Sequence, residues 1–333
     1  MDEVAGRSIL AIDLGGTQIR AAHVSPGLVV SCRRAVQTRD EEGVEAVIDR
    51  ICATAEGVRE EAERAGLPDP AAIGISAPGP LDPWQGVMIA PPNLAGWHDV
   101  PLAARVQDAV GLPTFLARDT NAAVVAEWRY GAARGADDVI YVTVSTGIGG
   151  GLVVNGRPVI GKDGSAGEIG HVTVDIDGPI CGCGMPGHAE GIGSGAAIAR
   201  AGRELLERGE APGLAALATS DPVDAKLVSR AADAGDAASQ AVLARAWEAI
   251  GALCAGLVIT LNPDVIVLGG SIALHRPELR AAVRAEIDRR AFAAAARRVR
   301  LEMAQLADDV SLIGMLPIVH DRLADPSYAK EHP

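Results

Sequence analysis

Four side chains of the metal-ligand type fall close together in the second half of the chain: His171, Cys181, Cys183 and His188. Imidazole and thiolate ligands at such spacings suit a tetrahedral Zn²⁺ ion, and a full set of four predicts a structural rather than a catalytic site. Glycine and proline between the ligands indicate turns, so the metal would hold an irregular loop. The alternative, loop thiols beside surface histidines, explains the clustering less well.

Acidic residues near these ligands and at a strand end are the candidates for chemistry. Glu168 and Glu190 flank the metal-ligand segment and are free for other work. Asp119 lies where an apolar strand, 114–117, meets an expected helix. A carboxylate there could be a general base that takes a proton from a substrate hydroxyl as it attacks phosphorus. The alternative is that Asp119 or Thr120 only caps the helix.

Two glycine-rich turns follow strand-like stretches in different halves of the chain. Backbone amides in such turns, at Gly15–Thr17 and at Thr146–Gly150, can approach a phosphate closely because no Cβ intervenes. Asp13, at the end of the first strand, would then hold Mg²⁺ directly or through water. Either turn alone could be a simple hairpin. Neither has the spacing of a Walker loop or of the dinucleotide fingerprint.

The elements that must position these residues alternate between strand and helix, which predicts an α/β fold with a largely buried sheet. Apolar runs that end in glycine or proline turns indicate strands, and apolar residues at helical spacing indicate helices. The expected strands are 8–13, 17–24, 71–76, 114–117, 139–145, 152–154 and 264–268, and the expected helices are 42–65, 119–130 and 236–260.

The bulk properties exclude several classes of protein. With 333 residues the chain predicts two domains, and its net charge of −13 argues against a nucleic-acid partner. Five cysteines without a disulfide pattern and an acidic N-terminus without a signal sequence predict a cytoplasmic protein. The longest apolar run, 250–261, is shorter than the ~20 residues that span a bilayer, so no membrane partner is expected.

Six motifs in register resemble the ROK family of bacterial glucokinases, other sugar kinases and sugar-responsive repressors. The resemblance covers about residues 8–323. Its motifs are DLGGT at 13–17, a PGP turn with PNLAGW at 92–97, the residues 119–121, STGIGGG at 145–151, GEIGH at 167–171 and CGCGMPGH at 181–188.

The resemblance implies an actin-like ATPase (ribonuclease H-like) fold with two α/β lobes that close around ATP and a hexose. The small lobe would comprise 1–118 plus 311–333, and the large lobe 119–310, with the zinc loop. ATP, Mg²⁺ and a structural Zn²⁺ are the implied cofactors, and a homodimer is the implied assembly.

The resemblance also implies roles for individual residues. Asp119 would be the catalytic base. The residues implied at the nucleotide and its magnesium are Asp13, Gly15, Gly16, Thr17, Thr146, Gly147, Gly269 and Gly270. Those implied at the sugar are Gly79, Asn93, Arg118, Asp119, Glu168, His171 and Glu190, with His171 also a zinc ligand.

The chain departs from the family pattern at two positions. His188 stands where a third cysteine is usual, and imidazole can still ligate zinc. Arg118 stands where an asparagine that contacts the sugar is usual. Turned inward, Arg118 could clamp a carboxylated or phosphorylated sugar or exclude plain glucose; turned outward, it would leave the contact to another residue.

The predicted function is ATP-dependent phosphorylation of a hexose, with glucose at its 6-hydroxyl as first choice. Alternatives are a kinase for an N-acyl-hexosamine, fructose or an acidic sugar, with ATP or polyphosphate as donor, and a catalytically silent sugar-binding protein. A DNA-binding regulator is not expected, because this sequence has little room before Asp13.

Overall fold

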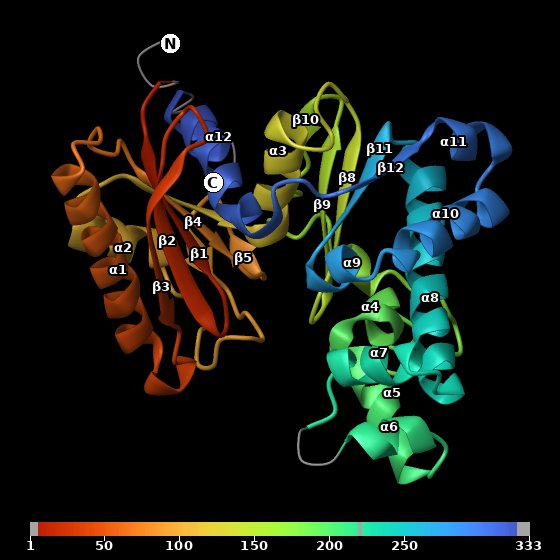
Figure 1. Cartoon of the computed structure of the whole chain (residues 1–333). Helices are drawn as coiled ribbons and strands as arrows, with labels where there is room; N and C mark the ends of the chain where they lie inside the picture. Colours follow the sequence, from red (N-terminus) through yellow and green to blue (C-terminus); the bar gives the residue numbers. More distant parts are fainter. Residues whose placement is uncertain (1–5, 219–221, 325–333) are drawn as a thin grey trace.

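Two five-stranded sheets form the centres of the two halves of the structure (Figure 1), a computed structural model that describes residues 6–218 and 222–324. The first sheet has the order β3-β2-β1-β4-β7 and the second the order β10-β9-β8-β11-β12. The strands are β1 Ile9–Leu14, β2 Gln18–Val24, β3 Val30–Gln37, β4 Ile73–Ala77, β7 Thr114–Arg118, β8 Val139–Val144, β9 Ile148–Val154, β10 Arg157–Pro158, β11 Val265–Gly269 and β12 Arg300–Met303, with a separate hairpin of β5 Leu81–Asp82 and β6 Val87–Met88.

Each sheet is covered by helices on both faces, as expected because central strands such as β4 and β11 are buried throughout. On the first sheet, α1 (Val44–Arg64) and α2 (Leu102–Val110) bury one face, and α12 (Val310–Ala324) packs on the other. On the second sheet, α3 (Asp119–Tyr130) covers one face. The opposite face is covered mainly by α4 Ala189–Gly193, α5 Gly195–Glu207, α6 Pro212–Leu217, α7 Ala225–Asp233, α8 Ala237–Leu261 and α10 Glu278–Arg290, with α9 Ser271–His275 and α11 Ala293–Arg298 at its edge.

Helices α3 and α12 lie between the two sheets and pack on each other (Figure 1). They approach so closely that a Cβ on Gly314 would overlap the backbone oxygen of Ala122. Because α3 also covers the second sheet and α12 the first, this contact joins the two halves. A glycine at residue 314 is therefore needed for the observed separation of the helices.

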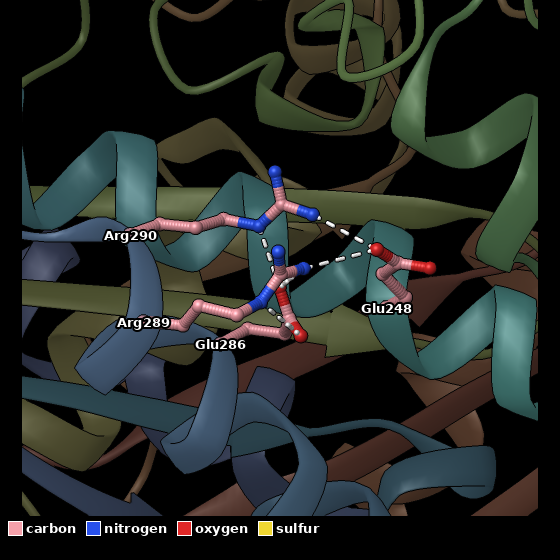
Figure 2. A network of polar contacts seen from close by, with 4 residues as sticks. All are labelled: Glu248, Glu286, Arg289 and Arg290. Carbon is pink, nitrogen blue, oxygen red and sulfur yellow. Dashed lines mark hydrogen bonds and ion pairs between the residues drawn. The ribbon is translucent and has the colours of Figure 1, made fainter.

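Helix α8 is the main core helix of the second half. By length and composition it could cross a membrane, but 56% of its most apolar window is buried inside the protein, as in a core helix. Figure 2 shows how it is tied to α10: Arg289 and Arg290 each pair with both Glu248 of α8 and Glu286 of α10. These exposed pairs contribute modestly, about 1 kcal/mol or less each.

The predicted elements are present, with differences at their ends. The apolar stretches 8–13, 114–117 and 264–268 are strands, and 119–130 and 236–260 are helices, within one or two residues. Among the elements that the sequence did not predict are β3, α2, α10, β12 and α12. The apolar residues of α12 are nearly continuous and include Pro317, so they show no helical period. The proposed division into lobes at 118/119 and 310/311 stays a proposal, and its ends at 1–5 and 325–333 lie outside the described residues.

Candidate functional site

Asp119 is the first residue of α3 and follows directly after β7, where its carboxylate is half-buried. Its Oδ1 accepts a hydrogen bond of 2.7 Å from the N–H of Thr120. A capping side chain would instead accept from an amide two or three residues further on. The residue in the cap position is Arg118, whose side chain makes no capping hydrogen bond. The geometry therefore favours a carboxylate available to a ligand over a helix cap.

The environment of Asp119 raises the pKa of its carboxyl from the usual 3.8 to about 6. Removal from water is the main cause, and the negative charge of Asp13 is the next. The Thr120 amide and the Arg118 cation lower the pKa, and the charge of Glu168 raises it. Asp13, Arg118 and Glu168 thus all lie close enough to influence Asp119. A carboxyl with this pKa is ionised at neutral pH and is basic enough to accept a proton.

Asp13 lies near the end of β1, and both of its oxygens are held. Oδ2 accepts from Arg20 Nη2 and Nε at 2.5 and 3.1 Å, and Oδ1 accepts from Ser76 Oγ at 3.3 Å. Arg20 faces Asp13 across the β1–β2 pair, and Ser76 is its neighbour on β4. The carboxylate is fixed in direction, and a cation that it binds would compete with Arg20.

The first glycine turn is closed by Thr38, which the sequence reading missed. Thr38 is buried; its Oγ1 donates to the Gly15 oxygen at 2.6 Å and its N–H donates to the Thr17 oxygen at 2.9 Å. Asn93 lies against the same turn, since a Cβ on Gly16 would come within 2.7 Å of the Asn93 backbone oxygen. The structure therefore brings Asn93 and this turn together, and Asp13 shortly precedes the turn in sequence.

The glycine run of the second half is mostly strand, which corrects the expected turn over 146–150. The chain turns only at residues 145–147, between β8 and β9, and Gly149–Gly151 belong to β9. On one face of β9, a Cβ on Gly149 would come within 2.8 Å of Thr120 Cγ2, and one on Gly151 would overlap the Thr120 oxygen. On the other face, a Cβ on Gly150 would overlap Ile169. These glycines let the start of α3 and the Glu168 segment approach β9 from opposite faces.

Arg118 turns inward and pairs with Glu168. The distance from Arg118 Nη2 to Glu168 Oε1 is 2.8 Å, and the Arg118 side chain is 4% exposed. Arg118 Nη1 donates to the Ala166 oxygen at 2.8 Å. Gly79 lies beside the pair, because a Cβ there would come within 3.3 Å of Arg118 Nε and 3.5 Å of Glu168 Oε1. Glu168, expected to be free, is therefore held through one oxygen.

Glu190 is also held, at the second turn. Its Oε2 accepts from the Ile148 N–H at 2.9 Å, and its Oε1 lies 3.7 Å from Cys181 Sγ. A Cβ on Gly147 would come within 2.7 Å of Oε2, so the carboxylate lies directly on the turn. Glu190 thus links the turn that contains Thr146 to the metal-ligand segment.

Gly269 and Gly270 follow β11 next to the same turn. Gly270 has a φ of +86°, and a Cβ on it would come within 2.5 Å of the Val144 oxygen. The neighbouring Ser271 Oγ lies 2.9 Å from Ser145 Oγ. The structure therefore groups the predicted adenosine segment with the second glycine turn. That the two glycine turns face each other stays a prediction.

The four predicted metal ligands lie together. One ligand atom from each of His171, Cys181, Cys183 and His188 lies within 4.8 Å of the others. Cys183 Sγ is 3.2 Å from His188 Nδ1, and Cys181 Sγ is 3.9 Å from His171 Nδ1. Ligand bonds of about 2.0–2.3 Å to a tetrahedral zinc place neighbouring ligand atoms roughly 3.3–3.8 Å apart. The group fits such an ion with small movements of the side chains.

A cavity of about 450 Å³ lies elsewhere, between α7, α8 and the α9–α10 segment, where Trp247 and Arg276 are among its lining residues. It includes none of the predicted site residues. Because Asp13 and Glu168 lie close to Asp119, at the ends of β1 and β7 and beside β9, we place the candidate site there.

Three residues that support the site were not predicted: Arg20, Thr38 and Ser76. The signal for Arg20 was present, since the short glycine turn between β1 and β2 places it opposite Asp13. Ser76 could be assigned only once β1 and β4 were known to be parallel neighbours. Thr38 lies far enough from the turn in sequence that no local pattern indicates it.

Comparisons with known proteins agree with this geometry. The chain is 32% identical to the glucokinase of Thermotoga maritima over 95% of this chain and 98% of the relative. It is 34% identical to the N-acetylmannosamine kinase of Citrobacter koseri over 80% and 84%. A crystal structure of a ROK family glucokinase from Streptomyces griseus in complex with glucose and AMPPNP has a TM-score of 0.79, 30% identity and coverage of 93% and 98%.

The expected fold and the expected family are both confirmed by these comparisons. The two lobes with their central sheets are the actin-like ATPase fold of the ROK sugar kinases. The family match runs through both sheets and the segment that joins them, over residues 9–322. With the motifs, the arrangement of the acids and these relatives in agreement, the chain belongs to the ROK family.

Proposed function

We propose that this protein transfers the γ-phosphoryl group of ATP to a hydroxyl of an uncharged hexose, with the 6-hydroxyl of glucose as first choice. One observation carries the proposal: the half-buried carboxylate of Asp119, whose pKa is raised to about 6, stands at the junction of β7 and α3 beside Asp13 and Glu168. The glucokinase relative and the glucose and AMPPNP complex support this choice.

In the proposed reaction Asp119 accepts the proton of the sugar hydroxyl as its oxygen attacks the γ-phosphorus. Glu168, Glu190 and Asn93 would hold the other hydroxyls in a fixed orientation, which reduces the entropy that the reacting pair must lose. The glycine turns at Gly15–Thr17 and Thr146–Gly147 would donate backbone N–H groups to the phosphates.

Two metals belong to this proposal. Mg²⁺, held near Asp13, would neutralise the charge that develops on the phosphates. Zn²⁺ would be held by the four-ligand group His171, Cys181, Cys183 and His188. Its role would be to fix the loop between Glu168 and Glu190, because Glu190 contacts Cys181 directly. We also propose that the protein is a cytoplasmic homodimer.

The second candidate is phosphorylation of an N-acyl-hexosamine, favoured by the N-acetylmannosamine kinase relative. A panel of glucose, mannose, fructose, N-acetylmannosamine, N-acetylglucosamine and glucuronate, each with ATP and with polyphosphate, separates these functions. We expect formation of sugar phosphate from glucose and ATP, and its loss in excess EDTA. A response confined to an N-acyl-hexosamine would replace the first choice, and hexose binding without any phosphate transfer would indicate a silent binder.

A further inference from the structure

The guanidinium of Arg118 is buried between the end of β7 and the loop that leads to Glu168. Its hydrogen-bonding groups are directed to one stretch of that loop: Nη1 donates to the Ala166 oxygen at 2.8 Å and lies 3.5 Å from the Gly164 oxygen, while Nη2 pairs with Glu168 at 2.8 Å. Arg118 belongs to the first sheet, whereas the loop follows β10 of the second sheet. A single side chain therefore joins the two halves beside the candidate site.

The same loop is covered from the first half as well. A Cβ on Gly164 would come within 2.6 Å of the Leu81 oxygen and 2.7 Å of Pro83 Cδ, which places the loop directly on the small β5–β6 hairpin. The contact that Arg118 makes is thus part of a packed boundary. Freedom of Glu168 to move away from Arg118 is limited on the backbone side by this packing and by Gly150 of β9.

Stability alone does not account for this arrangement. Burial of an ion pair removes both charges from water, and the attraction between them often does no more than offset that loss. In addition, Arg118 Nε is buried and has no hydrogen-bond partner among the described residues. An apolar side chain of similar length would satisfy the packing without these penalties. The contribution of Arg118 is better sought in the geometry that it imposes on Glu168.

The imposed geometry is asymmetric at the Glu168 carboxylate. Oε1 is taken by Arg118, while the side chain as a whole is 40% exposed. An unpaired glutamate on a loop would sample several rotamers, and it would lose that freedom on binding a sugar. A glutamate held through one oxygen has already lost much of this rotamer freedom before the sugar binds.

We propose that Arg118 is a positioning and specificity-determining residue, which holds Glu168 by one oxygen so that the other is presented to a hydroxyl of an uncharged sugar. This inference rests on the proposed sugar-kinase function. Since the cation is neutralised by Glu168 and directed to backbone carbonyls, it is not offered to a carboxylated or phosphorylated sugar. The charge of Asp13 is likewise paired with Arg20, so Asp119 and Glu190 leave the surroundings of the sugar negative, which disfavours anionic substrates.

The test compares four forms: the wild type, Arg118→Met, Glu168→Gln and the double variant. Methionine keeps an unbranched apolar chain, and glutamine keeps the shape of Glu168 while it removes the charge. We expect Arg118→Met to raise the KM for glucose about tenfold with kcat changed less than about threefold, because ground-state positioning is lost. The double variant should be about as impaired as Glu168→Gln alone, since the two residues act as a unit.

Two further variants keep the outcome interpretable. Arg118→Lys should restore only part of the affinity, because an ammonium cannot bond the carboxylate and the carbonyl in the fixed geometry of the guanidinium. Arg105→Met removes another arginine–glutamate pair, with Glu45 in the first half, and should leave the KM unchanged. AMPPNP affinity measured by calorimetry reports whether each variant retains its fold.

An unchanged KM in Arg118→Met, or losses that multiply in the double variant, would overturn the proposal. So would turnover of glucuronate by the wild type that Arg118→Met abolishes, because Arg118 would then bind the substrate directly. If no form transfers phosphate to any sugar, the proposed function fails; glucose affinity by calorimetry then decides the positioning role on its own, with the same tenfold loss expected.

Discussion

Arg118 and Glu168 are joined by an ion pair of 2.8 Å that connects the end of a strand in one sheet to a loop of the other. The pair lies next to Asp119, whose pKa responds to both charges. The residue that departs most from the family pattern is therefore in contact with the residues to which the family pattern assigns substrate binding and catalysis.

The pH dependence of activity should report the titration of Asp119. The pKa of its carboxyl is raised to about 6, and the base is active only when ionised, so activity is lost as pH falls through 6. We expect kcat/KM for glucose at saturating ATP to fall about tenfold per pH unit below 6 and to level off above 7. A flat profile between pH 5 and 7.5 would argue against Asp119 as the base.

The same shift predicts a stability effect with a defined sign. The pKa of Asp119 is higher in the folded protein than its usual 3.8, so the folded state is penalised when the group ionises, increasingly as pH rises from about 4 to 6. Asp119→Asn should therefore have a larger free energy of unfolding than the wild type at pH 8, by on the order of 1–3 kcal/mol. The difference should shrink below pH 4, and urea titrations at both pH values measure it. A variant less stable than the wild type at pH 8 would contradict this.

Removal of the metal should loosen the sugar side of the site. We expect one zinc per chain by atomic absorption, and strong chelation should lower the free energy of unfolding by roughly 2–4 kcal/mol. Cys183→Ser should lose the zinc and raise the KM for glucose, because the loop that leads to Glu190 of α4 is no longer fixed. Cys52→Ser replaces a half-buried thiol outside the four-ligand group and is the matched control. It should retain the zinc and the wild-type KM for glucose. A wild type that contains no zinc would refute this part of the account.

The contact between α3 and α12 should tolerate no added atom. Gly314→Ala places a Cβ against the backbone oxygen of Ala122 and should destabilise the protein by about 1–3 kcal/mol. Gly256→Ala is the matched control, because a Cβ there has nothing within 4 Å; it should be neutral or stabilise helix α8 by about 0.5–1 kcal/mol. Equal effects of the two substitutions would show that the helix separation is not fixed at Gly314.

The sequence predicted the elements that carry a strong local signal. β1, β7, α3 and α8 are apolar runs with clear ends, and the four metal ligands lie within one short segment, so their grouping depended little on the rest of the fold. The resemblance supplied the fold and the candidate site residues, which spacing alone did not.

The contacts that hold these residues depended on tertiary packing. Gly149–Gly151 looked like a loop, because a glycine run has no side-chain period; only the approach of Thr120 and Ile169 to opposite faces explains it as a strand. The partner of Arg118 was equally hidden, since Glu168 is distant in sequence and lies on a loop that follows the other sheet. That the Arg118 side chain turns inward toward an acid could be decided only from the folded structure.

The central claim is most directly tested by the formation of glucose 6-phosphate from glucose and ATP, measured side by side for the wild type and Asp119→Asn. The wild type should form the product, whereas in the variant kcat should fall by about 10²–10⁴ while glucose still binds with similar affinity. Turnover by Asp119→Asn close to that of the wild type would contradict the account.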